Sequence, residues 1–325
     1  MRRAPVGLVA ALFMCGAIVL GQGGGAGRQG GAGRGGGGTT ILEQASTDRA
    51  IAIPKEKLNG YLKDMDAKKL QTLRMIEGGK YNVNIRRITN AETALVHPNT
   101  IDTWVVIDGS GTLTTGGKLE NGKILNGVTN QLKVGDVVFI PSGLPHGVSG
   151  VNGNITWLNI RWDDDYPAGA QLGAGRGPQP AAPAAESGRG RGGAAPLEYA
   201  SKDRAVYIPK EKLDGYLRDM NAKNSGVLRM VEGGHYNVNI RRQPTPSGEF
   251  HPITIDTWVV LQGSGTVATG FQEKDDKRVE GTGVTAPAIL GDVFFIPASV
   301  THGPTEVKEP LAWLNVRWDV NWATK

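Results

Sequence analysis

Cysteine is almost absent from this chain: its 325 residues include one, Cys15, which lies in an apolar run near the N-terminus. The rest of the chain has no thiol with which to form a disulfide. Disulfide-stapled folds are therefore excluded, and stability has to come from buried apolar cores. Hydrophobic residues make up 39% of the chain and charged residues 21%, a balance that is typical of a globular protein.

A folded basic surface is also missing, although the net charge is +5. Arg2 and Arg3 stand at the N-terminus, and two Gly-rich strings at 21–38 and 167–196 carry a surplus of four positive charges. The remaining blocks have a net charge of −1. Binding to phosphates requires Lys and Arg clustered on a folded surface, so we expect no nucleic-acid partner.

Long hydrophobic runs are confined to Val6–Leu20, behind the two N-terminal arginines. A membrane-spanning helix needs about 20 apolar residues, whereas the apolar region of a signal peptide is shorter. We expect residues 1–22 to be a secretory signal peptide, with an uncleaved anchor as the alternative. The mature protein would then be periplasmic or extracellular, would make no membrane contact, and would begin with a Gly-rich spacer at 23–40.

What the chain has instead is an internal repeat. Five segments return in the same order about 155 residues later. The pairs are IPKEKLNGYLKDM and IPKEKLDGYLRDM, YNVNIRR twice, TIDTWVVIDGSGT and TIDTWVVLQGSGT, GDVVFIPSGLPHG and GDVFFIPASVTHG, and WLNIRWD and WLNVRWD. We expect tandem domains at 41–166 and 197–325, joined by a flexible Gly/Ala/Pro/Arg linker at 167–196. Such a linker is long enough for the two domains to pair with each other.

Each copy is predicted to begin with a short helix and to continue in strands. Behind Pro54, an apolar i, i+3, i+4, i+7 stripe runs from Leu58 to Met65, and the second copy repeats it. Runs rich in Val, Ile, Trp and Thr follow, and the GSGT segments at 109–112 and 263–266 are expected to be hairpin turns. The sequence therefore predicts an all-β fold of two small barrels or sandwiches.

Histidine is scarce, and four of the five form two matched pairs. In the first copy His97 precedes Asp102 by five residues, and His146 closes the GDVVFIP segment. The matching residues of the second copy are His251, Asp256 and His302. Two imidazoles and a carboxylate suit divalent Fe, Mn, Cu, Zn or Ni. We expect a divalent metal ion in at least one copy, the alternative being pairs of hydrogen-bonded structural histidines.

These segments resemble the two motifs of the cupin superfamily, G-x5-H-x-H-x3,4-E-x6-G and G-x5-P-x-G-x2-H-x3-N. The stretch from His97 to Gly109 matches the second half of the first motif, and Gly135 to His146 matches the second motif up to its final Asn. The second copy matches likewise, with Ser299 in place of the second Gly. The chain thus resembles a bicupin, which implies tandem jelly-roll barrels, each with a metal inside.

Two departures from the motifs stand out. The first His of H-x-H is Leu95 in one copy and Glu249 in the other, and the usual Glu is Asp in both. Residues two apart on a strand face the same way, so we expect Glu249 to share the cavity with His251. The second copy would then bind metal more tightly, with four ligands against three. The missing His also argues against the bicupins that resemble oxalate decarboxylase or oxalate oxidase.

Polar residues alternate with apolar ones in the YNVNIRR and WLN segments of both copies. The predicted substrate-binding residues are Asn84, Arg86, Arg161, Asn239, Arg241 and Arg317. Arginines in such a row would bind a carboxylate or sugar hydroxyls; the alternative is that the row faces solvent. Trp104 and Trp258 are expected to pack in the core.

Three classes of function stay open at this point. The first is a metal-dependent enzyme, for which the resemblance implies a dioxygenase-like oxidoreductase, an isomerase or a lyase. The second is a non-catalytic module that binds a carbohydrate or carboxylate. The third is a structural bicupin with degenerate sites. The first two classes expect a small-molecule ligand.

Overall fold

The computed structural model describes residues 39–164, 195–274 and 277–320. The predicted signal peptide, nearly all of the Gly-rich spacer and nearly all of the linker lie outside these residues, and the domain boundaries stay predictions. No helix in the described part of the chain is long and apolar enough to cross a membrane.

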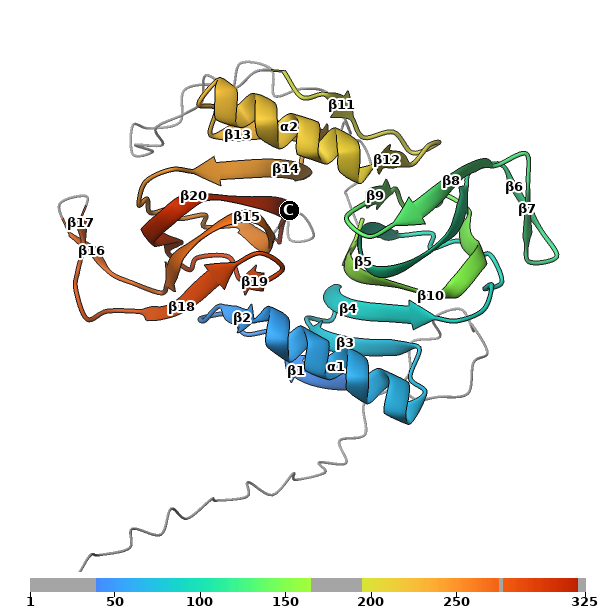
Figure 1. Cartoon of the computed structure of the whole chain (residues 1–325), viewed down its shortest axis with the longest axis horizontal. Coiled ribbons are helices and arrows are strands. Elements are labelled where there is room, and N and C mark those ends of the chain that lie inside the picture. The colour runs from blue at the N-terminus through green and yellow to red at the C-terminus, as the bar shows by residue number, and fades with distance from the viewer. Residues whose placement is uncertain (1–38, 165–194, 275–276, 321–325) are drawn as a thin grey trace, which may run out of the picture. The chain divides into compact units, whose positions relative to one another are not determined.

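Each copy contains one helix and a series of strands (Figure 1). The first copy holds β1 (Thr40–Gln44), β2 (Ile51–Ile53), α1 (Lys55–Lys68), β3 (Thr72–Glu77), β4 (Tyr81–Ile88), β5 (Thr100–Thr115), β6 (Lys118–Glu120), β7 (Lys123–Leu125), β8 (Val128–Lys133), β9 (Val137–Ile140) and β10 (His146–Asp163). The second holds β11 (Glu198–Tyr199), β12 (Val206–Ile208), α2 (Lys210–Ala222), β13 (Val227–Glu232), β14 (Tyr236–Gln243), β15 (Thr254–Thr269), β16 (Glu273–Lys274), β17 (Lys277–Arg278), β18 (Val284–Ile289), β19 (Val293–Ile296) and β20 (His302–Asp319).

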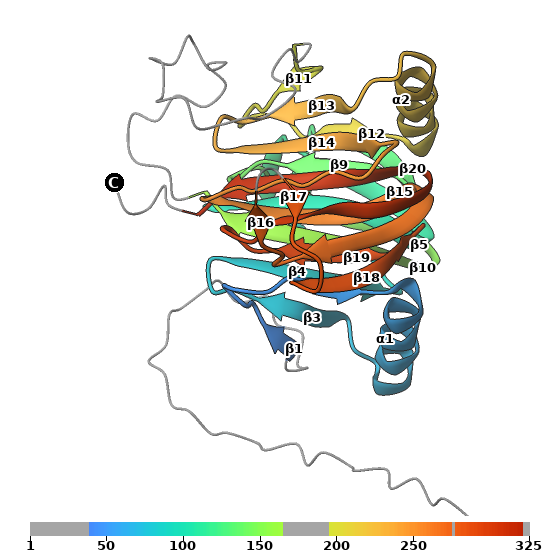
Figure 2. The same ribbon diagram turned by 90° about the vertical axis from the view of Figure 1, so that its left-hand side faces the viewer.

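The strand order is the same in the two copies. Six strands of the first copy run β1-β3-β4-β10-β5-β9, and β8 pairs with β5 as well; the second copy has the order β11-β13-β14-β20-β15-β19, with β18 on β15. The two longest strands of each copy, β5 with β10 and β15 with β20, lie antiparallel at the centre (Figure 2). The all-β fold with one helix per copy is confirmed.

The last strand of each sheet comes from the other copy. β12 pairs with β9, so that Ile208 lies opposite Val137, and β2 pairs with β19, so that Ile53 lies opposite Val293. In Figure 1 the blue strand β2 accordingly lies beside the orange strands of the second copy. The registers are equivalent, so the copies exchange the same strand reciprocally.

Each helix begins against the copy that receives its strand. The backbone N–H of Lys55 donates to Asp292 Oδ1 at 2.8 Å, and the N–H of Lys210 donates to Asp136 Oδ1 at 2.8 Å. The first backbone N–H groups of a helix have no partner within the helix, and a carboxylate there is favourable to the helix dipole. Neither Pro54 nor Pro209, the residues before the helices, makes a side-chain cap, so the capping acceptor is supplied across the repeat.

Three clusters of apolar residues form the cores. Two of them contain Trp104 and Trp258 and lie one in each barrel, which confirms that both tryptophans pack in the core. The third cluster draws on both copies and includes the outer row of β4 and β10 with its counterpart on β14 and β20. Trp162 and Trp318 stack within this cluster, with their ring centroids 5.3 Å apart and their ring planes at 1°. On the other face of these strands, Asn84 and Asn159 are 3% and 8% exposed, so the polar row does not simply face solvent.

The prediction that the GSGT segments are turns is wrong. Residues 109–112 continue β5, and 263–266 continue β15. Gly109 has φ +70°, and a Cβ there would lie 2.0 Å from the backbone oxygen of Asn154. The partner strand β10 shifts register at this point. The glycine therefore lets a continuous strand bend at a bulge rather than end.

Candidate metal centre

One histidine of each pair stands at the start of the long last strand. His146 Nδ1 lies 2.9 Å from the backbone oxygen of Leu144, and His302 Nδ1 lies 2.8 Å from that of Val300. A carbonyl oxygen only accepts, so Nδ1 carries the proton and Nε2 keeps its lone pair. A backbone carbonyl behind a histidine is the usual way to fix the tautomer that binds a metal.

The other histidine lies in a loop, not on the strand that the sequence predicted. His97 and His251 precede β5 and β15 without regular structure. The backbone is nevertheless fixed, because the N–H of Gly143 donates to the oxygen of His97 at 2.7 Å and the N–H of Ser299 to that of His251 at 2.8 Å. The glycine or serine of the second motif thus anchors the histidine of the first.

The aspartates lie on the central strands and are almost fully buried. Asp102 and Asp256 are 1% and 0% exposed. One oxygen of each, Oδ1, lies 2.8 Å from the Nε of the arginine opposite it in the sheet, which is Arg161 or Arg317. The arginine therefore orients the carboxylate and leaves Oδ2 directed at the histidines.

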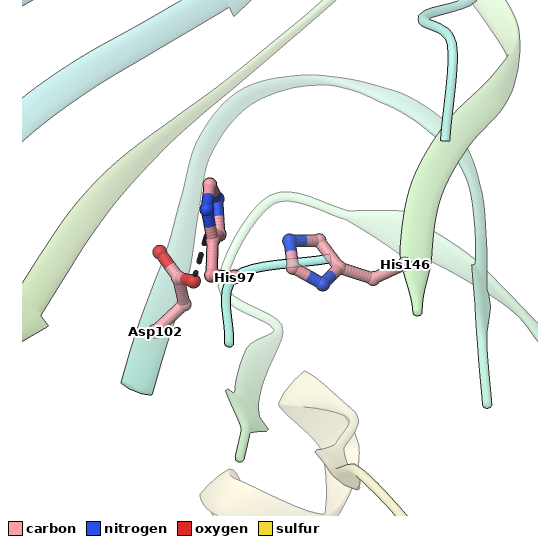
Figure 3. A group of neighbouring side chains, drawn as sticks. All are labelled: His97, Asp102 and His146. Carbon is pink, nitrogen blue, oxygen red and sulfur yellow. Dashed lines mark ion pairs between the residues drawn. The ribbon is translucent and has the colours of Figure 1, made fainter. Parts of the chain in front are cut away.

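The donor atoms of each copy converge, and Figure 3 shows those of the first barrel. In the first barrel one ligand atom from each of His97, Asp102 and His146 lies within 4.8 Å of the others. His97 Nε2 is 4.0 Å from Asp102 Oδ2. Two ligands that each lie about 2.1 Å from one ion are at most about 4.2 Å apart, so this spacing suits a shared ion.

The second barrel repeats the arrangement and adds a carboxylate. Asp256 Oδ2 is 3.8 Å from His251 Nε2 and 3.6 Å from His302 Nε2. A further set of donors within 4.8 Å of one another joins the two histidines to Glu249, whose Oε2 is 3.2 Å from His251 Nε2. Asp256 is outside this set. The two histidines therefore form one group with Asp256 and a second group with Glu249.

Leu95 takes the place of Glu249 in the first barrel, and it is 38% exposed. The other oxygen of Glu249 forms an ion pair with Arg241. Arg86, the counterpart of Arg241, pairs instead with Glu92. Sequence reasoning missed Glu92 because nothing acidic matches it in the repeat; only its position shortly before the first motif could have pointed to it.

Burial favours the neutral form of three of the four imidazoles, and the neutral form is the one that binds a metal. Burial lowers the pKa of His97 to about 4 and that of His302 to about 4, although a neighbouring aspartate opposes the shift in each. Burial also lowers the pKa of His146. For Asp256 burial acts against the charge, but Arg317 and the histidines outweigh it and lower the pKa of the carboxyl.

Comparison with solved structures gives matches over most of the chain. Salicylate 1,2-dioxygenase from Pseudaminobacter salicylatoxidans is 15% identical, with 84% of each chain covered and a TM-score of 0.55. The gentisate adduct of that enzyme is 15% identical, with 84% of this chain and 82% of that one covered and a TM-score of 0.52. The fold is that of a bicupin.

Other comparisons add little to the bicupin assignment. A cupin 2 conserved barrel domain protein from Leptotrichia buccalis is 10% identical over 76% of this chain and 88% of that one, with a TM-score of 0.43. No protein-family model and no curated protein matches the sequence. At these identities the likeness establishes the fold, and the reaction has to be argued from the site.

The residues of both bicupin sites fit a divalent ion. Asp102 Oδ2, Asp256 Oδ2 and His302 Nε2 are buried and have no hydrogen-bond partner. Buried polar atoms without partners are costly, by about 1–3 kcal/mol each, and charged oxygens cost more. A cation in each barrel would satisfy Asp102 Oδ2 in the first and Asp256 Oδ2 with His302 Nε2 in the second, and the donor set of nitrogen and carboxylate oxygen is the one such ions take.

The six predicted substrate-binding residues lie in the polar rows of β4 with β10 and of β14 with β20, three in each copy. All six have protein partners. Arg161 and Arg317 contact the aspartates, and Arg86 and Arg241 contact glutamates. The remaining two are amides: Asn84 Nδ2 donates to Asn82 and Asn239 Nδ2 to Asn237, both at 2.6 Å. Their role in binding a substrate stays a prediction.

Proposed function

We propose that this bicupin holds a divalent metal ion in each barrel and is a metal-dependent enzyme that acts on a small molecule, with oxygenase chemistry as the leading reaction class. One observation carries the proposal: in both copies a histidine fixed through Nδ1 lies beside a second histidine and a buried aspartate. A divalent ion with two His, one carboxylate and open positions supplies a site for dioxygen or polarises an oxygenated substrate.

The surrounding residues position the ligands. In the first barrel Arg161 orients Asp102, and Trp104 packs its edge against His146 with ring centroids 5.9 Å apart. Trp258 does the same for His302 at 5.4 Å. Ligands that are held in place before a reaction need little reorganisation during it, which favours catalysis over a degenerate site.

A small carboxylate or carbohydrate is the proposed ligand class. The structural neighbour is named as a salicylate dioxygenase and is known with gentisate bound, and both names denote small aromatic carboxylates. In this chain four arginines lie in the polar row, and planar guanidinium groups suit carboxylates. These features support a carboxylate more than a sugar.

Metal analysis combined with turnover tests the proposal. The purified protein is expected to contain divalent metal, and the His146→Ala and His302→Ala variants to lose it from the barrel concerned. His235→Ala is the matched control, because His235 lies outside both donor groups. Oxygen uptake on a panel of small aromatic and aliphatic carboxylates then separates an enzyme from a binding module. Wild-type protein that binds no divalent metal would contradict the proposal.

We also propose that the protein is exported and works outside the cytoplasm. The support is the pattern of residues 1–22, two arginines before a short apolar run, and the lack of cysteine in the rest of the chain. The mass of the protein isolated from the native host, compared with that of the full sequence, tests this.

We propose in addition that the two barrels stay paired in solution. The reciprocal strands β2 and β12 and the apolar cluster shared by both copies support the pairing. Small-angle scattering of the full chain would show one compact particle; two separated lobes would contradict the pairing.

A further inference from the structure

The two metal centres differ at one position whose backbone is the same in both. Leu95 and Glu249 each form an isolated antiparallel bridge with the second histidine, and the N–H of His146 or His302 donates to the oxygen of this residue at 2.9 Å. The difference between the barrels therefore lies in the side chain and not in the course of the chain.

Glu249 is held where it can bind the ion of the second barrel. Its Oε2 is 3.2 Å from His251 Nε2. Two ligands at right angles on an ion with bonds of about 2.1 Å are about 3.0 Å apart, so these atoms suit adjacent coordination positions. The ion pair with Arg241 fixes the other carboxylate oxygen, and the side chain is 19% exposed.

In the first barrel the acidic residue that pairs with the arginine stands at a different position in the sequence. Arg86 keeps a carboxylate partner, but that partner is Glu92, three residues before Leu95, and Glu92 is not among the donors that converge with His97. The arginine is therefore neutralised without a ligand beside the histidine. Leu95 is 38% exposed and offers no donor atom, so the position that Glu249 occupies in the other barrel has no protein ligand.

Charge balance indicates which kind of ligand would bind at this position. Asp102 is paired with Arg161, and Glu92 with Arg86. The protein groups around the first centre thus sum to zero, as they do in the second barrel, where Asp256 pairs with Arg317 and Glu249 with Arg241. A divalent ion in either barrel keeps a positive charge, but only the first barrel lacks a carboxylate oxygen at the position of Glu249. An anionic donor is favoured at such an ion, and the apolar Leu95 beside it suits a ligand that carries its anionic group on an apolar body.

We propose that the first barrel is the centre that accepts an exogenous small anion, and that Glu249 closes the same coordination position in the second barrel. This inference rests on the proposed metal-binding function and assigns the substrate to one of the two sites. Glu249 is then a protein ligand that excludes substrate, and Leu95 leaves the position free.

The test uses the full-length protein loaded with Co²⁺, with azide as the small anion and visible absorption as the readout. His302→Ala leaves cobalt in the first barrel, and His146→Ala leaves it in the second; His251→Ala and His97→Ala provide second versions of each. Cobalt content is measured before each titration. Azide is expected to shift the spectrum of cobalt in the first barrel and to bind the second at least about tenfold more weakly, which corresponds to about 1.4 kcal/mol.

Reciprocal substitutions make the test specific. Leu95→Glu is expected to abolish the azide response of the first barrel, and Glu249→Leu to create one in the second. Leu125→Glu, at an exposed position of the same barrel outside the donor group, controls for added charge. Equal azide responses in the two barrels, or a response confined to the second, would overturn this inference alone. Failure of both barrels to bind cobalt would overturn it together with the proposed function.

Discussion

At the residue scale, the buried aspartates contribute to stability through their charge as well as through any metal. Asp256 is fully buried and has Arg317 on one oxygen and two histidines near the other. Asp256→Ala leaves the partly buried guanidinium of Arg317 without its carboxylate partner. Removing one partner of a buried ion pair costs about 3–5 kcal/mol. Urea unfolding of the chelator-treated protein measures the loss. Asp64→Ala is the control, since its pair with Lys68 is exposed and should matter by less than about 0.5 kcal/mol.

Removal of the metal is expected to destabilise the folded protein. An ion that binds only the native state adds about 4 kcal/mol when its free concentration is a thousand times the dissociation constant. A chelator should therefore lower the melting temperature of the wild-type protein measurably. The double variant His146→Ala, His302→Ala should show almost no further decrease on chelation, and an equal decrease in both proteins would point to ions bound elsewhere.

The repeat explains which site residues could be predicted. His97, Asp102 and His146 were predicted because the same residue types recur at the same spacing in the second copy. Glu92 was not predicted, since its counterpart in the backbone pairing is Ser247. Its role rests on a contact with Arg86 that no spacing rule gives. The carbonyls that fix the histidines were equally hidden, because backbone oxygens carry no sequence signal.

At the element scale, each helix depends on a carboxylate from the opposite copy. Asp136 accepts hydrogen bonds from the N–H of Lys210 at 2.8 Å, the N–H of Lys133 at 3.0 Å and the hydroxyl of Tyr207 at 2.9 Å. Asp136→Ala leaves the two N–H groups without this acceptor and leaves the Tyr207 hydroxyl only the backbone oxygen of Gln131, 3.0 Å away. We expect a loss of about 3 kcal/mol, measured by urea unfolding.

The equivalent residue of the other copy gives a graded comparison. Asp292 accepts from the N–H of Lys55 and the N–H of Ile289, while Ala52 stands in the position of Tyr207 and offers no hydroxyl. Asp292→Ala is therefore expected to cost less than Asp136→Ala, by about the 1 kcal/mol of one hydrogen bond. The reverse order would show that the tyrosine contact is not stabilising.

Local patterns predicted an element well where the spacing of apolar residues fits only one kind of secondary structure. The apolar stripe from Leu58 to Met65 placed the first helix, since that period occurs only in helices. The GSGT segments misled because glycine marks both a turn and a bulge. Only the partner strand decides between them, and the partner residues, Asn154 for Gly109 and Pro310 for Gly263, lie far along the chain.

At the scale of the whole molecule, the exchanged strands tie the two metal centres to one structure. One edge of β9 pairs with β5 at Asp102, and the other edge of β9 pairs with β12 of the second copy. The sequence allowed the copies to pair but did not identify this exchange. Strands β2 and β12 are three-residue apolar segments, and a segment that short carries no information on which sheet receives it.

The exchange predicts that the linker is dispensable once the chain has folded. An engineered protease site within residues 167–194 would allow the folded protein to be cut in two. Because two strands, two capping aspartates and the stacked Trp162 and Trp318 join the halves, the fragments should elute as one particle in gel filtration and separate only in denaturant. In Asp136→Ala, Asp292→Ala protein, which lacks both caps, the cut halves should separate at a lower urea concentration. Fragments that part without denaturant would show that the linker, not the exchanged strands, keeps the barrels together.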